Sequence, residues 1–224
     1  RDAERLIGEG RVVLNNVTVA HPATFVSAGD IVRIDRTVVD APGRTRLWRY
    51  HKPSGLVTTH RDPDGRPTVF AALPPTLPRV VSVGRLDLTS EGLLLLTNDG
   101  GLARRLELPA MGWTRRYRVR VHGDPDPRVL ASLARGLTIA GVRYGPIDAA
   151  LDTRKGENAW LTLSLREGKN REVRRVMEHL GLVVTRLIRI AYGPFQLGLL
   201  RRGAVEEVPA RVLRDQLPDD IKRP

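Results

Sequence analysis

Hydrophobic positions occur in short runs along most of the chain, and their period changes from strand-like to helix-like. Residues 80–83 and 93–97 are apolar runs on either side of a polar turn. Residues 116–122 alternate with the period of two that is typical of strands, and 159–165 and 182–190 are further strand candidates. Three segments favour helices instead, at 101–106, 126–135 and 170–180. Strands and short helices in this mixed order predict an α+β domain on a mostly antiparallel or mixed sheet.

The first 35 residues have a weaker pattern that indicates a small, separate module. Asp2–Gly10 is predicted to be the end of a helix, and Asn15-Asn16 a tight turn between two short strands. A further strand is expected at 31–34, followed by a linker that contains Pro42 and Gly43. We therefore divide the chain into a partial module with linker (1–42), a larger domain (43–208) and a C-terminal tail (209–224), expected to be polar or weakly helical.

The charge balance points to a polyanionic partner. Lys and Arg number 37 against 25 Asp and Glu, which gives a net charge of +12 and a sequence pI near 11.1. Such a surplus favours nucleic acid binding over a basic but unrelated enzyme. Cysteine is absent, which fits a cytoplasmic protein, and no histidines stand at metal-ligand spacing. No apolar run approaches the ~20 residues that span a bilayer.

The segment 84–92 is the strongest candidate for a catalytic site. It is a polar turn with Gly84 and Gly92 at its ends, and it lies between two apolar strands with Asp87 in the middle. Such a turn can hold a side chain rigidly at the edge of a sheet. Alternatively, Asp87 or Ser90 only forms a hydrogen bond within its own turn. Local features leave both interpretations open.

Four segments resemble the pseudouridine synthases of the small-ribosomal-subunit type, in the same order as in that family. Residues 84–100 resemble the signature whose Gly-Arg-Leu-Asp motif carries the catalytic aspartate. Residues 52–59, 116–119 and 165–176 resemble the opening strand and turn, the tyrosine strand, and the strand-to-helix segment with a basic partner. Residues 11–32 resemble the second half of an S4-like RNA-binding module, whose first helix would precede Arg1. The resemblance implies a monomeric enzyme that isomerises a uridine of ribosomal RNA without metal or cofactor.

The resemblance also implies roles for individual residues. Asp87 would be the nucleophile, attacking either the uracil ring or the sugar carbon. Tyr117 would stack on the uracil and move a proton, and Arg174 would keep Asp87 ionised. Leu187 would line the uracil pocket. Contacts to RNA phosphates are expected from Arg85, Lys169 and Arg189.

One departure and two rival functions accompany this assignment. Many relatives have His-Gln where this chain has Arg171-Glu172, which adds one basic and one acidic charge beside the expected cleft.

Residues 55–61 and 63–78 favour a large-subunit RNA target. A non-catalytic RNA-binding or ribosome-assembly protein is the main alternative. A hydrolase or nucleotide-dependent enzyme is disfavoured, because the sequence has neither a nucleophile elbow nor a phosphate-binding glycine loop.

Overall fold

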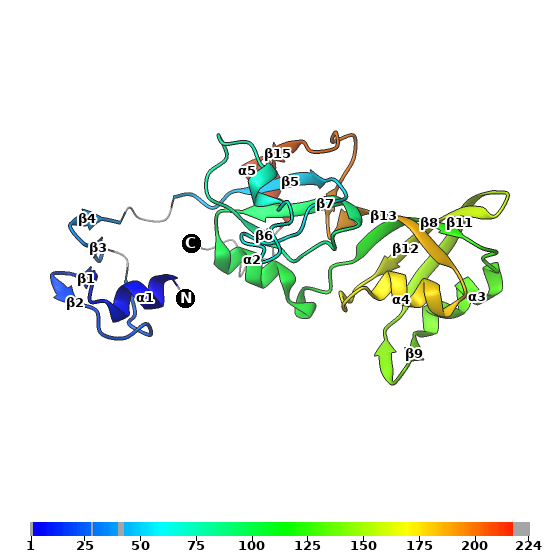
Figure 1. The fold of residues 1–224 in the computed structure, drawn as a ribbon, viewed down its shortest axis with the longest axis horizontal. Helices are drawn as coiled ribbons and strands as arrows, with labels where there is room; N and C mark the ends of the chain where they lie inside the picture. Colours follow the sequence, from blue (N-terminus) through cyan, green and yellow to red (C-terminus); the bar gives the residue numbers. More distant parts are fainter. Residues whose placement is uncertain (1, 28, 40–42, 217–224) are drawn as a thin grey trace. The chain divides into compact units, whose positions relative to one another are not determined.

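The computed structural model describes residues 2–27, 29–39 and 43–216, and the chain forms two compact units, residues 1–45 and 46–224 (Figure 1). We describe each unit by itself. No helix in the described ranges is long and apolar enough to cross a lipid bilayer.

The first unit is a short helix, α1 (Asp2–Gly8), followed by a small antiparallel sheet. Its described strands are β1 (Val12–Leu14), β2 (Val17–Thr18), β3 (Val32–Ile34) and β4 (Thr37–Val38), in the order β2-β1-β3-β4. The predicted turn at Asn15-Asn16 is confirmed. Both residues have positive φ, 48° and 68°, as a two-residue hairpin turn of this hand requires. The Asn15 side chain also donates to Asp30 Oδ1 at 2.7 Å, which ties this turn to the next loop.

The second unit is built on one large sheet in the order β11-β12-β8-β13-β7-β5-β15, with β14 beside β13 and β6 beside β7. The described strands are β5 (Leu47–Lys52), β6 (Val81–Val83), β7 (Ser90–Thr97), β8 (Arg115–His122), β11 (Ile147–Lys155), β12 (Asn158–Leu165), β13 (Val183–Tyr192), β14 (Phe195–Gln196) and β15 (Val205–Glu207). β9 (Leu137–Ile139) and β10 (Val142–Tyr144) form a separate hairpin. β7 and β13 pair in parallel, whereas the other described pairs are antiparallel. The predicted α+β class with a mostly antiparallel sheet is confirmed.

Four helices of the described second unit cover this sheet: α2 (Gly100–Glu107), α3 (Pro127–Ser132), α4 (Glu172–His179) and α5 (Ala210–Gln216). The Asp99 side chain caps α2 by accepting the Leu102 amide at 2.9 Å, and α2 corresponds to the helix predicted at 101–106. The helix predicted at 170–180 is confirmed as α4, and its apolar residues Val173, Val176 and Met177 are buried. The expected polar tail contains α5, whose Leu213 packs into the core, while residues 217–224 lie outside the described part of the chain.

The core covers the two halves of the sheet differently. Along β7, Leu93 and Leu95 face α2, while Leu94 and Leu96 pack with Trp48 on the opposite face. The half that contains β8, β11 and β12 has one apolar face, which packs against α4. Figure 1 shows α3 and α4 on the same side of these strands. The other face of this half is therefore open to solvent.

Candidate active site

The loop between β6 and β7 holds Asp87 in a fixed main-chain position. The Thr58 hydroxyl lies 2.8 Å from the Leu86 carbonyl and 3.3 Å from the Leu86 amide, and the Gly84 amide donates to Glu107 Oε1 at 2.6 Å. Leu86 is itself buried in the core. The Asp87 side chain is half-buried and makes no hydrogen bond or ion pair with any described residue. The interpretation that Asp87 only caps its own turn therefore does not describe this carboxylate.

Lys52 forms hydrogen bonds to the main chain of the same loop, a role that we did not predict. Its side chain is fully buried at the end of β5, and Nζ donates to the carbonyls of Pro53, Asp87 and Ser90 at 2.9–3.1 Å. Burial lowers the pKa of Lys52 to about 8. The signal in the sequence is a lysine at the period-two position that follows Trp48 and Tyr50, where an apolar residue is expected.

Asp87 opens into a cleft of about 1060 Å³. Tyr117 on β8 and Leu187 on β13 line it, because the register places Leu187 beside Val119 of β8 and Ser90 of β7. Six of the seven predicted site residues line this cleft: Arg85, Asp87, Tyr117, Lys169, Leu187 and Arg189.

Arg174, the seventh predicted residue, lies behind the loop. Its Nη2 donates to the Thr89 carbonyl at 3.2 Å, and its Nη1 to the Val184 carbonyl at 3.4 Å. Burial is the main influence that lowers the pKa of Arg174, and the Asp87 charge opposes it, so the two groups are within electrostatic reach. No direct ion pair joins them among the described residues. Arg174 therefore stabilises the position of the Asp87 loop through hydrogen bonds to main-chain carbonyls.

Arg189 differs from the expected surface phosphate contact, since only 3% of the residue is exposed. Its Nε donates to the Leu93 carbonyl at 2.8 Å, and its guanidinium lies 5.0 Å from the centre of the Tyr192 ring. Nη2 is buried without a partner among the described residues. Arg115, which we did not predict, contacts the same tyrosine by donating to its hydroxyl at 3.1 Å. Both arginines are therefore part of the cleft wall.

The segment before α4 contributes charged groups to the cleft. Arg85 and Arg171 are exposed, and Lys169 pairs with Glu167. Glu172 is only 4% exposed; its Oε2 accepts the Lys169 amide at 2.8 Å, whereas its Oε1 is unpartnered in the described chain. Burial raises the pKa of Glu172. The acidic half of the Arg-Glu departure is therefore a buried group of the cleft wall.

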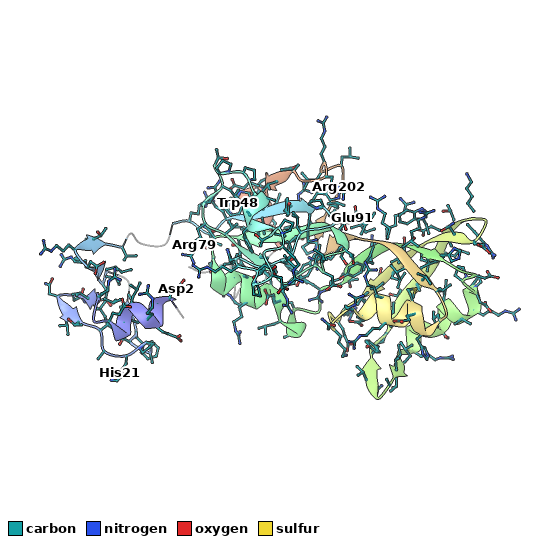
Figure 2. All side chains as sticks on the ribbon, in the orientation of Figure 1. Asp2, His21, Trp48, Arg79, Glu91 and Arg202 are labelled. Carbon is teal, nitrogen blue, oxygen red and sulfur yellow. The ribbon has the colours of Figure 1, made fainter. Side chains whose placement is uncertain are left out.

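Glu91 is not a second carboxylate for the Asp87 cleft. Glu91, labelled in Figure 2, accepts two hydrogen bonds from Arg186 at 2.9 and 3.1 Å. These bonds lower the pKa of Glu91 and raise that of Arg186. Neither residue lines the cleft.

The arrangement suits attack by a carboxylate on a planar, anionic substrate. Asp87 has no ion-pair partner among the described residues, Tyr117 offers a ring and a hydroxyl in the same cleft, and Leu187 offers an apolar surface. Cationic side chains in the same cleft can bind phosphates. Within the described ranges, no three His, Cys, Asp or Glu side chains are grouped as metal ligands.

Comparison with known proteins gives one consistent answer. Residues 46–179 match the family model described as RNA pseudouridylate synthase. An uncharacterised RNA pseudouridine synthase of Rickettsia bellii is 48% identical over 214 residues, covering 96% of this chain and 93% of the relative. Ribosomal large subunit pseudouridine synthase B of Salmonella typhi is 41% identical over 219 residues, covering 92% of this chain and 74% of the relative. A crystal structure of a pseudouridylate synthase has the same fold, with a TM-score of 0.69, 24% identity, and coverage of 96% and 93% of the two chains. This chain therefore belongs to the RNA pseudouridine synthases and is an isomerase.

Proposed function

We propose that this protein converts a uridine of large-subunit ribosomal RNA to pseudouridine, with Asp87 as the nucleophile. The observation that carries the proposal is the Asp87 carboxylate, which is half-buried, unpartnered among the described residues, and held in a cleft with Tyr117 and Leu187. The choice of the large subunit is supported by relatives that are named for it. Residues 11–32 would contribute an S4-like surface for the same RNA.

In the proposed reaction, the Asp87 carboxylate attacks either the uracil ring or the sugar carbon, and both routes have the same balance. The bond from the sugar carbon to the ring nitrogen breaks, the base turns, and a ring carbon bonds to the sugar carbon as the carboxylate leaves. The hydrogen of that ring carbon departs as a proton, and the ring nitrogen gains one. Tyr117 stacks on the base and its hydroxyl is placed to carry a proton. The product is an isomer, so the reaction needs no net oxidant or reductant.

The substrate must leave its stacked position to reach Asp87. Extruding a base costs a few kcal/mol, and less in a loop or a weak pair. Arg85 and Lys169 at the cleft would hold phosphates of the flanking nucleotides, while Arg189 would donate its Nη2, which has no partner among the described residues, to a group deeper in the cleft.

The proposal is tested by tritium release from transcripts that contain uridine tritiated at the ring carbon that forms the new bond. Large-subunit and small-subunit ribosomal RNA are assayed separately, and the modified position is mapped by carbodiimide primer extension. Release from the large-subunit transcript alone is the expected result. Release from the small-subunit transcript alone would overturn the choice of substrate. Binding of both transcripts without release would favour the non-catalytic RNA-binding or ribosome-assembly alternative.

A further inference from the structure

The sheet of the second unit has an open face on the side opposite to the catalytic cleft. Successive side chains of a strand point to opposite faces. On β8, Tyr117 and Val119 point to the cleft and the core, so Arg116, Arg118 and Arg120 point to the other face, where all three are exposed. We call the open surface of β8, β11 and β12 the Trp160 face; its defining residues are Arg116, Arg118, Arg120, Lys155, Asn158 and Trp160.

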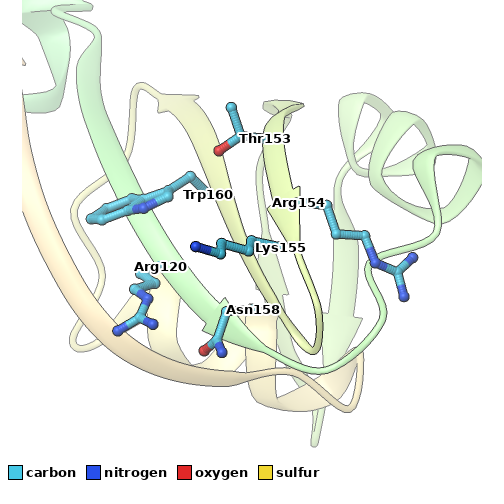
Figure 3. Close-up of a pocket in the computed structure, with 6 residues that line it drawn as sticks. All are labelled: Arg120, Thr153, Arg154, Lys155, Asn158 and Trp160. Atoms are coloured by element: carbon cyan, nitrogen blue, oxygen red, sulfur yellow. The ribbon is translucent and has the colours of Figure 1, made fainter.

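The strand register assembles these side chains into one hollow. Trp160 of β12 lies opposite Arg120 of β8 and Thr153 of β11, and Asn158 lies opposite Lys155. The hollow measures about 580 Å³ and is lined by Arg120, Thr153, Arg154, Lys155, Asn158 and Trp160. Figure 3 shows the Lys155 side chain directed toward Trp160 and Arg120, whereas Arg154 points away from them.

Trp160 is a half-exposed aromatic ring at a position where solvent-facing strands usually carry polar groups. The Arg118 guanidinium lies 4.7 Å from the ring centre, where a cation–π contact holds the indole, and Trp160 itself lines the hollow. A further planar group could therefore stack on this indole ring. A base of single-stranded RNA is such a group, since every base has a face that can stack on an aromatic ring.

The charges of the Trp160 face are only partly neutralised by the protein. Arg154 pairs with Asp124 at 2.5 Å, and Arg118 approaches Asp152 at 4.0 Å. By contrast, the side chains of Arg116, Arg120 and Lys155 make no ion pair or hydrogen bond with any residue that the structure describes. Unneutralised cations beside an aromatic ring match the combined phosphate and base chemistry of single-stranded nucleic acid. An acidic protein surface would satisfy the cations alone.

We propose that the Trp160 face is a second RNA-binding surface, which holds a single-stranded stretch of the substrate away from the catalytic cleft. One base stacks on Trp160, and its neighbouring phosphates contact Arg120 and Lys155. This inference rests on the proposed function for the identity of the RNA, but the binding surface itself requires no catalysis. The Trp160 face would select RNA that continues as a single strand beyond the modified nucleotide.

The test uses the full chain and a 12-nucleotide RNA of A and C only, which contains no uridine and cannot be a substrate. Affinity is measured over a series of salt concentrations for the wild type and for Arg120→Ala/Lys155→Ala. Arg128→Ala/Arg143→Ala removes the same charge from exposed positions on α3 and β10, outside the hollow and the cleft. The first double variant should bind at least about fivefold more weakly, with a salt slope shallower by about 1.4, corresponding to two phosphates. The control should bind like the wild type.

Tryptophan fluorescence locates the base. Quenching by the oligonucleotide should be present in the wild type and largely lost in Trp160→Phe, a variant that retains a ring and the packing of β12. Equal affinity of both double variants, or equal quenching in Trp160→Phe, would overturn the proposal. Displacement of the RNA by polyglutamate at equal charge would overturn it in favour of an acidic protein partner. If the wild type releases no tritium from ribosomal RNA yet binding depends on Arg120, Lys155 and Trp160, the proposed function fails and the RNA surface stands.

Discussion

At the scale of single residues, catalysis is expected to depend on how firmly the Asp87 loop is held. Arg174 donates to the Thr89 carbonyl and sits within electrostatic reach of Asp87, without forming an ion pair with it. Lys52 donates to the carbonyl of Asp87 itself. Main-chain contacts thus fix the position of Asp87, and Arg174 is a cation within its electrostatic reach.

Arg174→Ala should lower kcat by about 100-fold, the usual effect of removing one preorganised donor, while RNA affinity changes less than about threefold. Arg174→Lys keeps the charge but cannot make both carbonyl contacts, so its kcat should be intermediate. The exposed neighbour serves as control: Arg175→Ala should leave both quantities unchanged. Single-turnover assays and filter binding separate the two effects. Equal losses of turnover and affinity in Arg174→Ala would mean that this arginine only binds RNA.

The buried amine of Lys52 predicts a pH dependence of activity. Below its pKa of about 8, the ammonium has three N–H donors for the carbonyls of Pro53, Asp87 and Ser90. Above that pH the neutral amine has only two, so kcat should fall as the pH rises through about 8. Lys52→Met should reduce kcat and lose this limb of the pH profile. A wild-type limb that persists in Lys52→Met would have to be assigned to another group.

Glu172 predicts a pH-dependent gain in stability on substitution. Burial raises its pKa above the unfolded value, so the folded state disfavours the ionised form at neutral pH, and this cost disappears as the carboxyl is protonated at low pH. Glu172→Gln should raise Tm at pH 7.5 by about 2–4 °C, which corresponds to ~1 kcal/mol in a chain of this size. The gain should shrink as the pH falls and vanish below about pH 4.5, the unfolded-state value. Thermal unfolding at both pH values checks this, and an equal gain at both would show that the ionised carboxylate is not the cause.

At the scale of elements, the parallel pairing of β7 and β13 joins the Asp87 loop to the strand that carries Leu187. Gly92 makes this pairing possible. Its φ is +101°, and a Cβ atom there would lie 2.3 Å from the Arg189 carbonyl oxygen. A side chain at this position would therefore push the two strands apart.

Gly92→Ala should lower the free energy of unfolding by about 3 kcal/mol or more, because it adds a clash between two buried strands to backbone strain. Gly203→Ala provides the matched control: its φ is +79°, and no atom lies within 4 Å of the added Cβ. The free energy of unfolding of that variant should fall by only about 1–2 kcal/mol, the conformational cost of a non-glycine residue at positive φ. Urea unfolding measures both. If both variants lost a similar free energy of unfolding, the main chain at Arg189 would be able to move away from the added Cβ atom.

The elements that the sequence predicted well are those with strict local patterns. β8 and α4 were predicted within two residues of their observed bounds because one face of each is continuously apolar. The β9–β10 hairpin was missed, since its turn places Ala140 at a positive φ of 46°, where glycine or asparagine is the usual signal. β15 was missed because its three residues have no strand pattern of their own and are extended only because they pair with β5. Within the candidate site, motif resemblance pointed to Asp87 and Tyr117, which the fold brings to one cleft, but the burial of Arg189 depends on contacts far apart in the sequence.

At the scale of the whole molecule, cationic side chains gather on two different surfaces of the second unit. The cleft combines cations with the Asp87 carboxylate, a tyrosine and a leucine, which suits chemistry on one nucleotide. The Trp160 face combines an aromatic ring with Arg116, Arg120 and Lys155, which have no ion-pair partner among the described residues, and no described carboxylate lines its hollow, which suits binding alone. The surplus of Lys and Arg is visible in the composition, but only the fold shows which of these side chains share a surface.

The nucleophilic role of Asp87 is tested most directly by comparing wild type, Asp87→Asn and Asp64→Asn on the same tritiated large-subunit transcript. Asp64→Asn makes the same change of charge at an exposed position that does not itself line the cleft, while its ion-pair partner Arg66 does. Asp87→Asn should bind RNA as the wild type does and release tritium at least about 10³-fold more slowly, whereas Asp64→Asn should retain full turnover. Release by Asp87→Asn at the wild-type rate would contradict the assignment of Asp87 as the nucleophile.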